Sequence, residues 1–159
     1  MKLYEVQNRD PVLLAALLNV WEASVRATHR FLSDAEVRRI REFVPQALRS
    51  VEHLIVSENG RGEPAAFMGV TGDRLEMLFL APAERGRGTG GRLLCCAVAR
   101  YGVREVTVNE QNPQAVGFYE HVGLQTYRPG RGGRAVPAAV YAPEGGRAAG
   151  TRRELEVRN

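Results

Sequence analysis

The spacing of apolar residues changes several times along the chain, and each spacing predicts a different element. Residues 2–7 alternate apolar and polar side chains, which is typical of a strand. Asp10 followed by Pro11 predicts a helix start, because aspartate caps a helix and proline suits its first position. Apolar residues then recur on one face of a helix over residues 12–27: Leu14, Leu17, Leu18, Trp21 and Val25.

A second helix and a hairpin are predicted next. Residues 33–36, "SDAE", have the form of a capping box and predict a helix start, and we expect Pro45 to break or kink that helix. Residues 53–58 and 65–72 are short β-type runs on either side of the turn at residues 59–64. These two runs therefore predict a β-hairpin.

Strands and helices alternate in the second half of the chain. The order predicts an α/β (α+β) fold, with a mixed sheet and helices on both faces, over residues 1–142 as one domain. Residues 143–159 are rich in Gly and Arg without a clear period, and we expect a basic, disordered tail there. The further elements are strands at 74–82, 104–109, 124–129 and 135–143, and helices at 90–101 and 113–123.

Composition narrows the class of protein. A chain of 159 residues is long enough for one domain with a sizeable core, and its net charge of +4 favours anionic ligands without requiring nucleic acid. Cys95 and Cys96 are adjacent on a predicted helix, where a disulfide between them would be strained. The chain has neither an apolar run of about 20 residues nor an apolar signal segment. We expect a cytoplasmic protein that binds neither nucleic acid nor a membrane.

The segment "ERGRGTGGRLL", residues 84–94, joins a predicted strand to a predicted helix. A helix N-terminus offers unpaired N–H groups and a partial positive charge, which suit phosphate. Its glycines let the backbone approach a ligand closely, while Arg85 and Arg87 add positive charge. The segment therefore predicts a binding site for a phosphate, most of all a pyrophosphate.

Two other phosphate-binding motifs fit this segment less well. A nucleotide-hydrolase P-loop requires Gly-Lys-Ser/Thr where this chain has Gly-Gly-Arg, which excludes it. Gly86, Gly88 and Gly91 satisfy the dinucleotide pattern, and Glu110 follows at about 20 residues, near the place of a ribose-binding acid. The pattern lies past the middle of the chain, however, and a proline separates it from the strand. A nicotinamide dinucleotide-binding protein is therefore the weaker alternative.

Two motifs together resemble one family. Residues 78–94, "LFLAPAERGRGTGGRLL", resemble motif A of the GNAT superfamily of N-acetyltransferases, Gln/Arg-x-x-Gly-x-Gly/Ala, through Arg85, Gly88 and Gly90. Residues 109–124 resemble its motif B, in the right order and at the right interval. The matching residues of motif B are Asn112, Ala115, Phe118, Tyr119, Gly123 and Leu124.

The resemblance covers about residues 3–142, and residues 21–33 together with residues 109–119 resemble a small bacterial branch of the superfamily. The chain departs from that branch at residues 135–143, where an aromatic, Leu-rich last strand is expected. The resemblance implies a mostly antiparallel sheet whose strands splay at the cofactor site. It further implies direct transfer of an acetyl group from acetyl-CoA to an amine-bearing acceptor, a small molecule or a protein. We also expect that the protein can form a homodimer.

Residues for the cofactor and for catalysis follow from the resemblance. Tyr119 is implied as the general acid that protonates the departing thiolate, and backbone N–H groups at Leu78–Leu80 are implied to polarise the thioester carbonyl. No metal is expected. The implied cofactor-binding set is Leu78, Phe79, Leu80, Arg85, Gly86, Arg87, Gly88, Thr89, Gly90, Gly91, Asn112, Ala115, Phe118 and Tyr119. Packing in the core is an alternative role for Phe118.

The acceptor side is less determined by the sequence. Glu76 and His29 are candidates for the general base, and Glu110 or a chain of water molecules are alternatives. The candidate acceptor pocket consists of Trp21, His29, Phe31, Asn109 and Glu110, although helical spacing also fits Trp21 as a core residue. A protein of this family that binds acyl-CoA as a sensor, or that has lost activity, is the non-enzymatic alternative.

Overall fold

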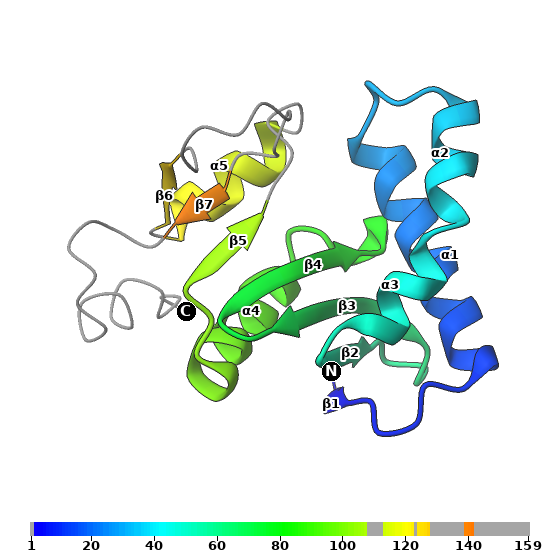
Figure 1. Ribbon diagram of the computed structural model, residues 1–159, viewed down its shortest axis with the longest axis horizontal. Coiled ribbons are helices and arrows are strands. Elements are labelled where there is room, and N and C mark those ends of the chain that lie inside the picture. The colour runs from blue at the N-terminus through cyan, green and yellow to red at the C-terminus, as the bar shows by residue number, and fades with distance from the viewer. Residues whose placement is uncertain (1, 108–112, 123, 128–138, 142–159) are drawn as a thin grey trace.

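The computed structural model describes residues 2–107, 113–122, 124–127 and 139–141 (Figure 1). Its strands are β1 (Lys2–Glu5), β2 (His53–Glu58), β3 (Pro64–Thr71), β4 (Arg74–Leu80), β5 (Glu105–Thr107), β6 (Gln125–Tyr127) and β7 (Ala139–Tyr141). Its helices are α1 (Pro11–Thr28), α2 (Asp34–Arg41), α3 (Val44–Ser50), α4 (Thr89–Tyr101) and α5 (Pro113–His121), with a short 3₁₀ helix, η1 (Pro82–Glu84), before α4. In the part of the chain so described, no helix has the length and apolar character needed to cross a membrane.

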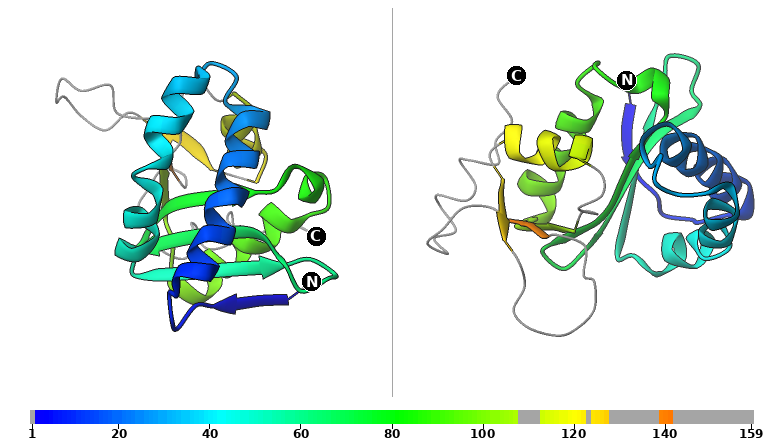
Figure 2. Two further views of the ribbon diagram at one scale, coloured as in Figure 1. Left: turned by 90° about the vertical axis from the view of Figure 1, so that its right-hand side faces the viewer. Right: turned by 90° about the horizontal axis from the view of Figure 1, so that it is seen from above.

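The strands form one sheet in the order β1-β2-β3-β4-β5-β7-β6. Every neighbouring pair is antiparallel except β4 and β5, which run parallel. Helices α1, α2 and α3 cover one face of the sheet, and α4 and α5 cover the other (Figure 2). The predicted mixed sheet with helices on both faces is therefore confirmed, as is its mostly antiparallel pairing.

A separate hydrophobic core lies on each face of the sheet. Successive residues of a strand point to opposite faces, so Phe67 of β3 packs into the core beneath α1 while its neighbour Met68 packs against α4. Leu14, Leu17 and Trp21 of α1 belong to the first core, as the helical spacing predicted. The second core contains Leu93, Leu94, Ala97 and Val98 of α4, whose spacing puts them on one face of the helix predicted there.

The helix starts follow the capping residues in the sequence. The Asp10 side chain accepts a hydrogen bond of 2.9 Å from the Leu13 backbone N–H at the start of α1. Ser33 and Glu36 form both bonds of the predicted capping box at the start of α2. Pro45 lies in the first turn of α3 and so separates it from α2, which confirms the predicted break.

The sheet opens between β4 and β5. Strand β4 pairs with β3 over its whole length, whereas the described residues of β5 pair with it through Arg74↔Glu105 and Leu75↔Val106 alone. The register against β3 shifts by one residue between Leu75 and Met77, so Glu76 is the extra residue of a β-bulge. Because a bulge bends and twists its strand, it helps β4 to diverge from β5. The splayed strands implied by the resemblance are thus present.

A glycine opposite this bulge generates a prediction about stability. A Cβ atom at Gly69 would lie 2.8 Å from Met77 Cγ and 2.9 Å from Val51 Cγ1. We expect Gly69→Ala to lower the free energy of unfolding by about 1–3 kcal/mol, because the core must move to admit the methyl group. Gly60→Ala is the control, since no atom would lie within 4 Å of its Cβ. Urea unfolding measures both variants, and equal losses would contradict the packing described here.

Candidate active site

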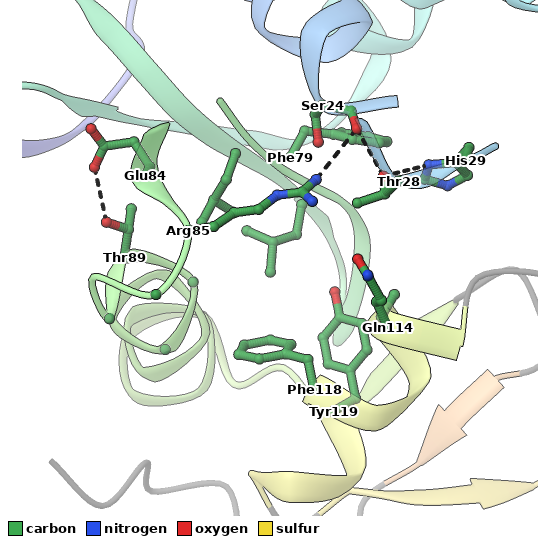
Figure 3. A pocket seen from close by; sticks show the side chains of 17 residues that line it. Ser24, Thr28, His29, Phe79, Glu84, Arg85, Thr89, Gln114, Phe118 and Tyr119 are labelled. Atoms are coloured by element: carbon green, nitrogen blue, oxygen red, sulfur yellow. Dashed lines mark hydrogen bonds between the residues drawn. The ribbon is translucent and has the colours of Figure 1, made fainter. Parts of the chain in front are cut away.

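A cavity of about 360 Å³ lies where β4 and β5 diverge (Figure 3). Its walls are the end of α1, the second half of β4, the glycine turn with the start of α4, and one face of α5. Thirteen of the site residues predicted from the sequence line it: His29, Leu78, Phe79, Leu80, Arg85, Gly86, Gly88, Thr89, Gly90, Gly91, Ala115, Phe118 and Tyr119. The fold therefore brings segments that are far apart in the sequence to one cavity.

The glycine turn exposes backbone at one end of the cavity. Gly86 (φ 70°) and Gly88 (φ 81°) adopt left-handed conformations that favour glycine, and a Cβ atom at either position would meet no atom within 4 Å. Gly88 is also the N-cap of α4, where it has no side chain to accept a bond from the first-turn N–H groups. The start of α4 therefore keeps backbone donors and the positive end of its dipole for an anion.

Both arginines of the turn contact groups of the protein. Arg85 extends across the cavity to α1, where Nη2 donates to the Ser24 carbonyl oxygen at 3.4 Å (Figure 3). Arg87 Nη1 lies 3.7 Å from Glu84 Oε1. The other carboxylate oxygen of Glu84 accepts a bond of 3.2 Å from Thr89 Oγ1. Glu84, a residue only 8% exposed, thus connects the two ends of the turn through its side chain.

His29 lies at the opposite end of the cavity, directly after α1. The Thr28 hydroxyl is 2.8 Å from the Ser24 carbonyl oxygen and 2.9 Å from His29 Nδ1. Burial lowers the pKa of the His29 imidazole, and the positive charge of Arg85 lowers it further. His29 is therefore uncharged at neutral pH and can accept a proton. Its ring also packs on Phe31, with 5.3 Å between the ring centroids.

Tyr119 reaches the cavity from α5, and its hydroxyl points into it (Figure 3). The residue is 6% exposed, and burial raises the pKa of the phenol well above its ordinary value. Tyr119 therefore keeps its proton at neutral pH. Phe118 packs edge-on against Tyr119 and against the core, and it also lines the cavity. Its ring would lie 3.3 Å from a Cβ at Gly90, so glycine there lets α4 and α5 approach closely.

Several predicted site residues lie elsewhere. Glu76 is exposed at the bulge, and Trp21 is buried in the core beneath α1 with its ring edge-on to Phe79. Phe31 contacts His29 without lining the cavity, and Arg87 pairs with Glu84. Asn109, Glu110, Asn112 and Gly123 lie outside the described residues.

Four cavity residues were not predicted from the sequence: Ser24, Thr28, Glu84 and Gln114. Ser24 and Thr28 continue the helical spacing of the apolar face through Leu17 and Trp21, so two polar residues on a buried face were an available signal. Glu84 offered no such signal, because its burial depends on how the turn folds.

The comparison with known proteins decides the family. Residues 23–134 match the family model of the GNAT acetyltransferase domain. The chain belongs to the GNAT acetyltransferase family. This confirms the resemblance and the expectation of an enzyme that transfers an acetyl group to an amine, in place of a nicotinamide-binding protein. Acetyltransferases of this family use acetyl-CoA as the donor.

Curated relatives and solved structures agree with this assignment. The chain is 41% identical to the peptidyl-lysine N-acetyltransferase YjaB of Escherichia coli and 39% identical to that of Salmonella typhimurium, covering 69% of this chain and 74% of each relative. The solution structure of apo YjaB from Escherichia coli superposes with a TM-score of 0.74 at 32% identity, over 89% of this chain and 97% of that one. At 17% identity, the PaiA N-acetyltransferase of Thermoplasma acidophilum in complex with coenzyme A shares the fold, with a TM-score of 0.68 over 89% and 99% of the two chains.

The contact between the turn and α1 generates a prediction for this family member. Arg85→Gln removes the positive charge that lowers the pKa of His29, so we expect that pKa to rise while remaining lowered by burial. A titration of the histidine Cε1 protons by NMR measures it. Arg87→Gln is the matched control, because the charge of Arg87 pairs with Glu84. An equal rise in both variants would contradict a specific effect of Arg85.

Proposed function

We propose that this enzyme acetylates lysine side chains of proteins or peptides, with acetyl-CoA as the donor. The observation that carries the proposal is one cavity with a glycine turn at one end, His29 at the other and the Tyr119 hydroxyl pointing into it. The two curated relatives are named for peptidyl-lysine acetylation, which supports lysine as the acceptor.

The described residues fit acetyl-CoA. The open space beside Gly86 and Gly88 and the uncapped start of α4 suit a pyrophosphate, and Ala115 is a small residue beside the path toward Tyr119. In this proposal the backbone of the turn holds the phosphates, and β4 with α5 holds the arm of the cofactor. Acetyl-CoA bound there supplies an acetyl group on sulfur, whose transfer leaves a thiolate that needs a proton.

The edge of β4 that lies beyond its described pairs with β5 has a role in this arrangement. Leu78, Phe79 and Leu80 line the cavity beyond the two residue pairs that join β4 to β5. Among them, backbone N–H groups on the edge released from β5 are donors that can stabilise negative charge on a carbonyl oxygen in the cavity. We therefore assign the polarisation of the acetyl carbonyl to this edge.

The proton transfers are assigned to two residues. Tyr119 holds a proton at Oη inside the cavity and is the proposed general acid. Among the base candidates in the described part of the chain, His29 lines the cavity whereas Glu76 is an exposed residue outside it. His29 is uncharged at neutral pH and is the proposed general base.

The cofactor assignment predicts a loss of binding in Gly88→Val. A branched side chain would fill the open space beside the turn, so we expect the affinity for coenzyme A to fall about tenfold or more while the fold is kept. Gly62→Val is a strict control. Gly62 has a similar φ of 76°, and a Cβ atom there would also meet no atom within 4 Å, but it lies in the hairpin between β2 and β3. Both substitutions carry a conformational cost of about 1–2 kcal/mol. Calorimetry that finds equal affinities in the two variants would refute the site.

The assignment of Tyr119 as the general acid predicts that removing its hydroxyl lowers kcat without changing the affinity for coenzyme A. Tyr119→Phe removes one hydroxyl, so we expect kcat to fall about 100-fold or more, since general acids typically contribute 10²–10⁴-fold. The affinity for coenzyme A should remain, because the proton is needed only as the bond to sulfur breaks. Thiol release with a lysine peptide measures kcat, and Tyr101→Phe at the end of α4 controls for loss of a phenol elsewhere. A wild-type kcat in Tyr119→Phe would mean that another group is the acid.

A further inference from the structure

We propose that Thr28 is a positioning residue that fixes His29 as the Nδ1–H tautomer, so that Nε2 is the ring atom that takes the proton from the acceptor amine. The tautomer follows from the contacts of Thr28. Its use in catalysis rests on the proposed function.

The tautomer follows from the fact that Thr28 Oγ1 has one proton and makes two contacts. This oxygen lies 2.8 Å from the Ser24 carbonyl oxygen, and two oxygens at that distance share a proton. The carbonyl has none to give, so the single hydroxyl proton of Thr28 is donated to Ser24. The second contact, 2.9 Å from Oγ1 to His29 Nδ1, then needs a proton that the ring supplies. Nδ1 therefore donates, and the lone pair of the neutral imidazole is on Nε2.

The local structure explains why the hydroxyl takes this direction. Thr28 is the last residue of α1, and a threonine in a helix commonly donates to the carbonyl four residues earlier. The same carbonyl accepts from Arg85 Nη2 at 3.4 Å, so it attracts donors from two elements. Phe31 packs on the imidazole, with 5.3 Å between the ring centroids, and restricts its rotation. The ring is thus held both by a hydrogen bond and by packing.

At neutral pH the imidazole of His29, which lines the cavity, is in its neutral form. Among described residues, the charged group that acts on the imidazole is the Arg85 guanidinium, which with burial lowers the pKa of His29. The proton balance of the step is short. The acceptor ammonium gives one proton to Nε2, and the ring becomes an imidazolium whose Nδ1–H is still donated to Thr28. The proton on Nε2 passes to solvent after the product leaves, and the second proton that the nitrogen loses on becoming an amide replaces the one that Tyr119 gives to the thiolate.

NMR of the imidazole nitrogens tests the tautomer without any substrate. The ¹⁵N-labelled protein contains three histidines, and His29→Gln assigns the signals of His29. At a pH where the ring is neutral, we expect a protonated Nδ1 and an unprotonated Nε2 in the wild type and in Thr28→Ser. Thr28→Val has the same shape without the hydroxyl, so its Nδ1–H population should fall. A protonated Nε2 in the wild type, or an unchanged tautomer in Thr28→Val, would overturn the proposal.

Kinetics with acetyl-CoA and a lysine peptide test the catalytic half. We expect Thr28→Val to lower kcat about tenfold or more with little change in the KM for acetyl-CoA, because a base in the wrong tautomer loses much of a general-base effect of 10²–10⁴-fold. Thr28→Ser should restore most of the rate, which a purely steric role of the methyl group would not allow. Thermal unfolding confirms that each variant is folded.

The outcomes separate this inference from the proposed function. If Thr28→Val changes the tautomer but both it and His29→Gln keep the wild-type kcat and pH profile, Nε2 is not the base, although the tautomer stands. If the wild type acetylates no lysine peptide, the proposed acceptor is wrong, and the role of Nε2 toward it fails as well. A wild-type Nε2–H signal overturns the inference while peptide acetylation is unaffected.

Discussion

The early end of the pairing between β4 and β5 is the constraint on which the cavity depends. Among the residues that the structure describes, two pairs join these strands, and the strands then run apart (Figure 1). A backbone edge inside a protein normally finds partners, because an unsatisfied N–H or C=O away from water is costly. Here the edge of β4 beyond these two pairs becomes a wall of the cavity, where water or a ligand can satisfy its backbone groups. The bulge at Glu76 contributes by bending β4 at the point of divergence.

Charge is distributed along the cavity rather than gathered at the glycine turn. The turn offers mainly backbone donors, since Arg87 pairs with Glu84 and Arg85 crosses to α1. Arg85 lies beside the last turn of α1, where its positive charge interacts favourably with the negative end of the helix dipole. The same guanidinium adds to the effect of burial, which is the larger of the two, in lowering the pKa of the His29 imidazole. One side chain of the turn therefore affects the electrostatics of both ends of the cavity.

Much of this arrangement could be predicted from local signals in the sequence. Asp10, Ser33 and Pro45 set helix boundaries through contacts within a few residues, and the two apolar helical faces follow from spacing alone. The glycine turn could also be predicted, because left-handed conformations and a helix start are local properties.

The parts that could not be predicted depend on long-range contacts. Arg85 donates to Ser24, 61 residues away in the sequence, and no pattern near either residue specifies the other. Glu76 occupies a strand that leads to the cavity, but the one-residue register shift leaves it exposed outside the cavity. Trp21 was a candidate for the acceptor pocket although its spacing fitted the core, and only the packed structure, in which it is 4% exposed and does not line the cavity, distinguishes the two.

The separation of the two hydrophobic cores has a consequence for how such a site diversifies. The glycine turn leads into α4, whose apolar face belongs to one core, whereas His29 and Thr28 end a helix that belongs to the other. The sheet lies between them, so residues of α1, α2 and α3 can be exchanged with little disturbance of the packing that shapes the turn. Substitutions in α1, α2 and α3 can therefore change the acceptor side of the cavity while the glycine turn keeps its shape. The condition is that the contact from Arg85 to α1 is kept or replaced.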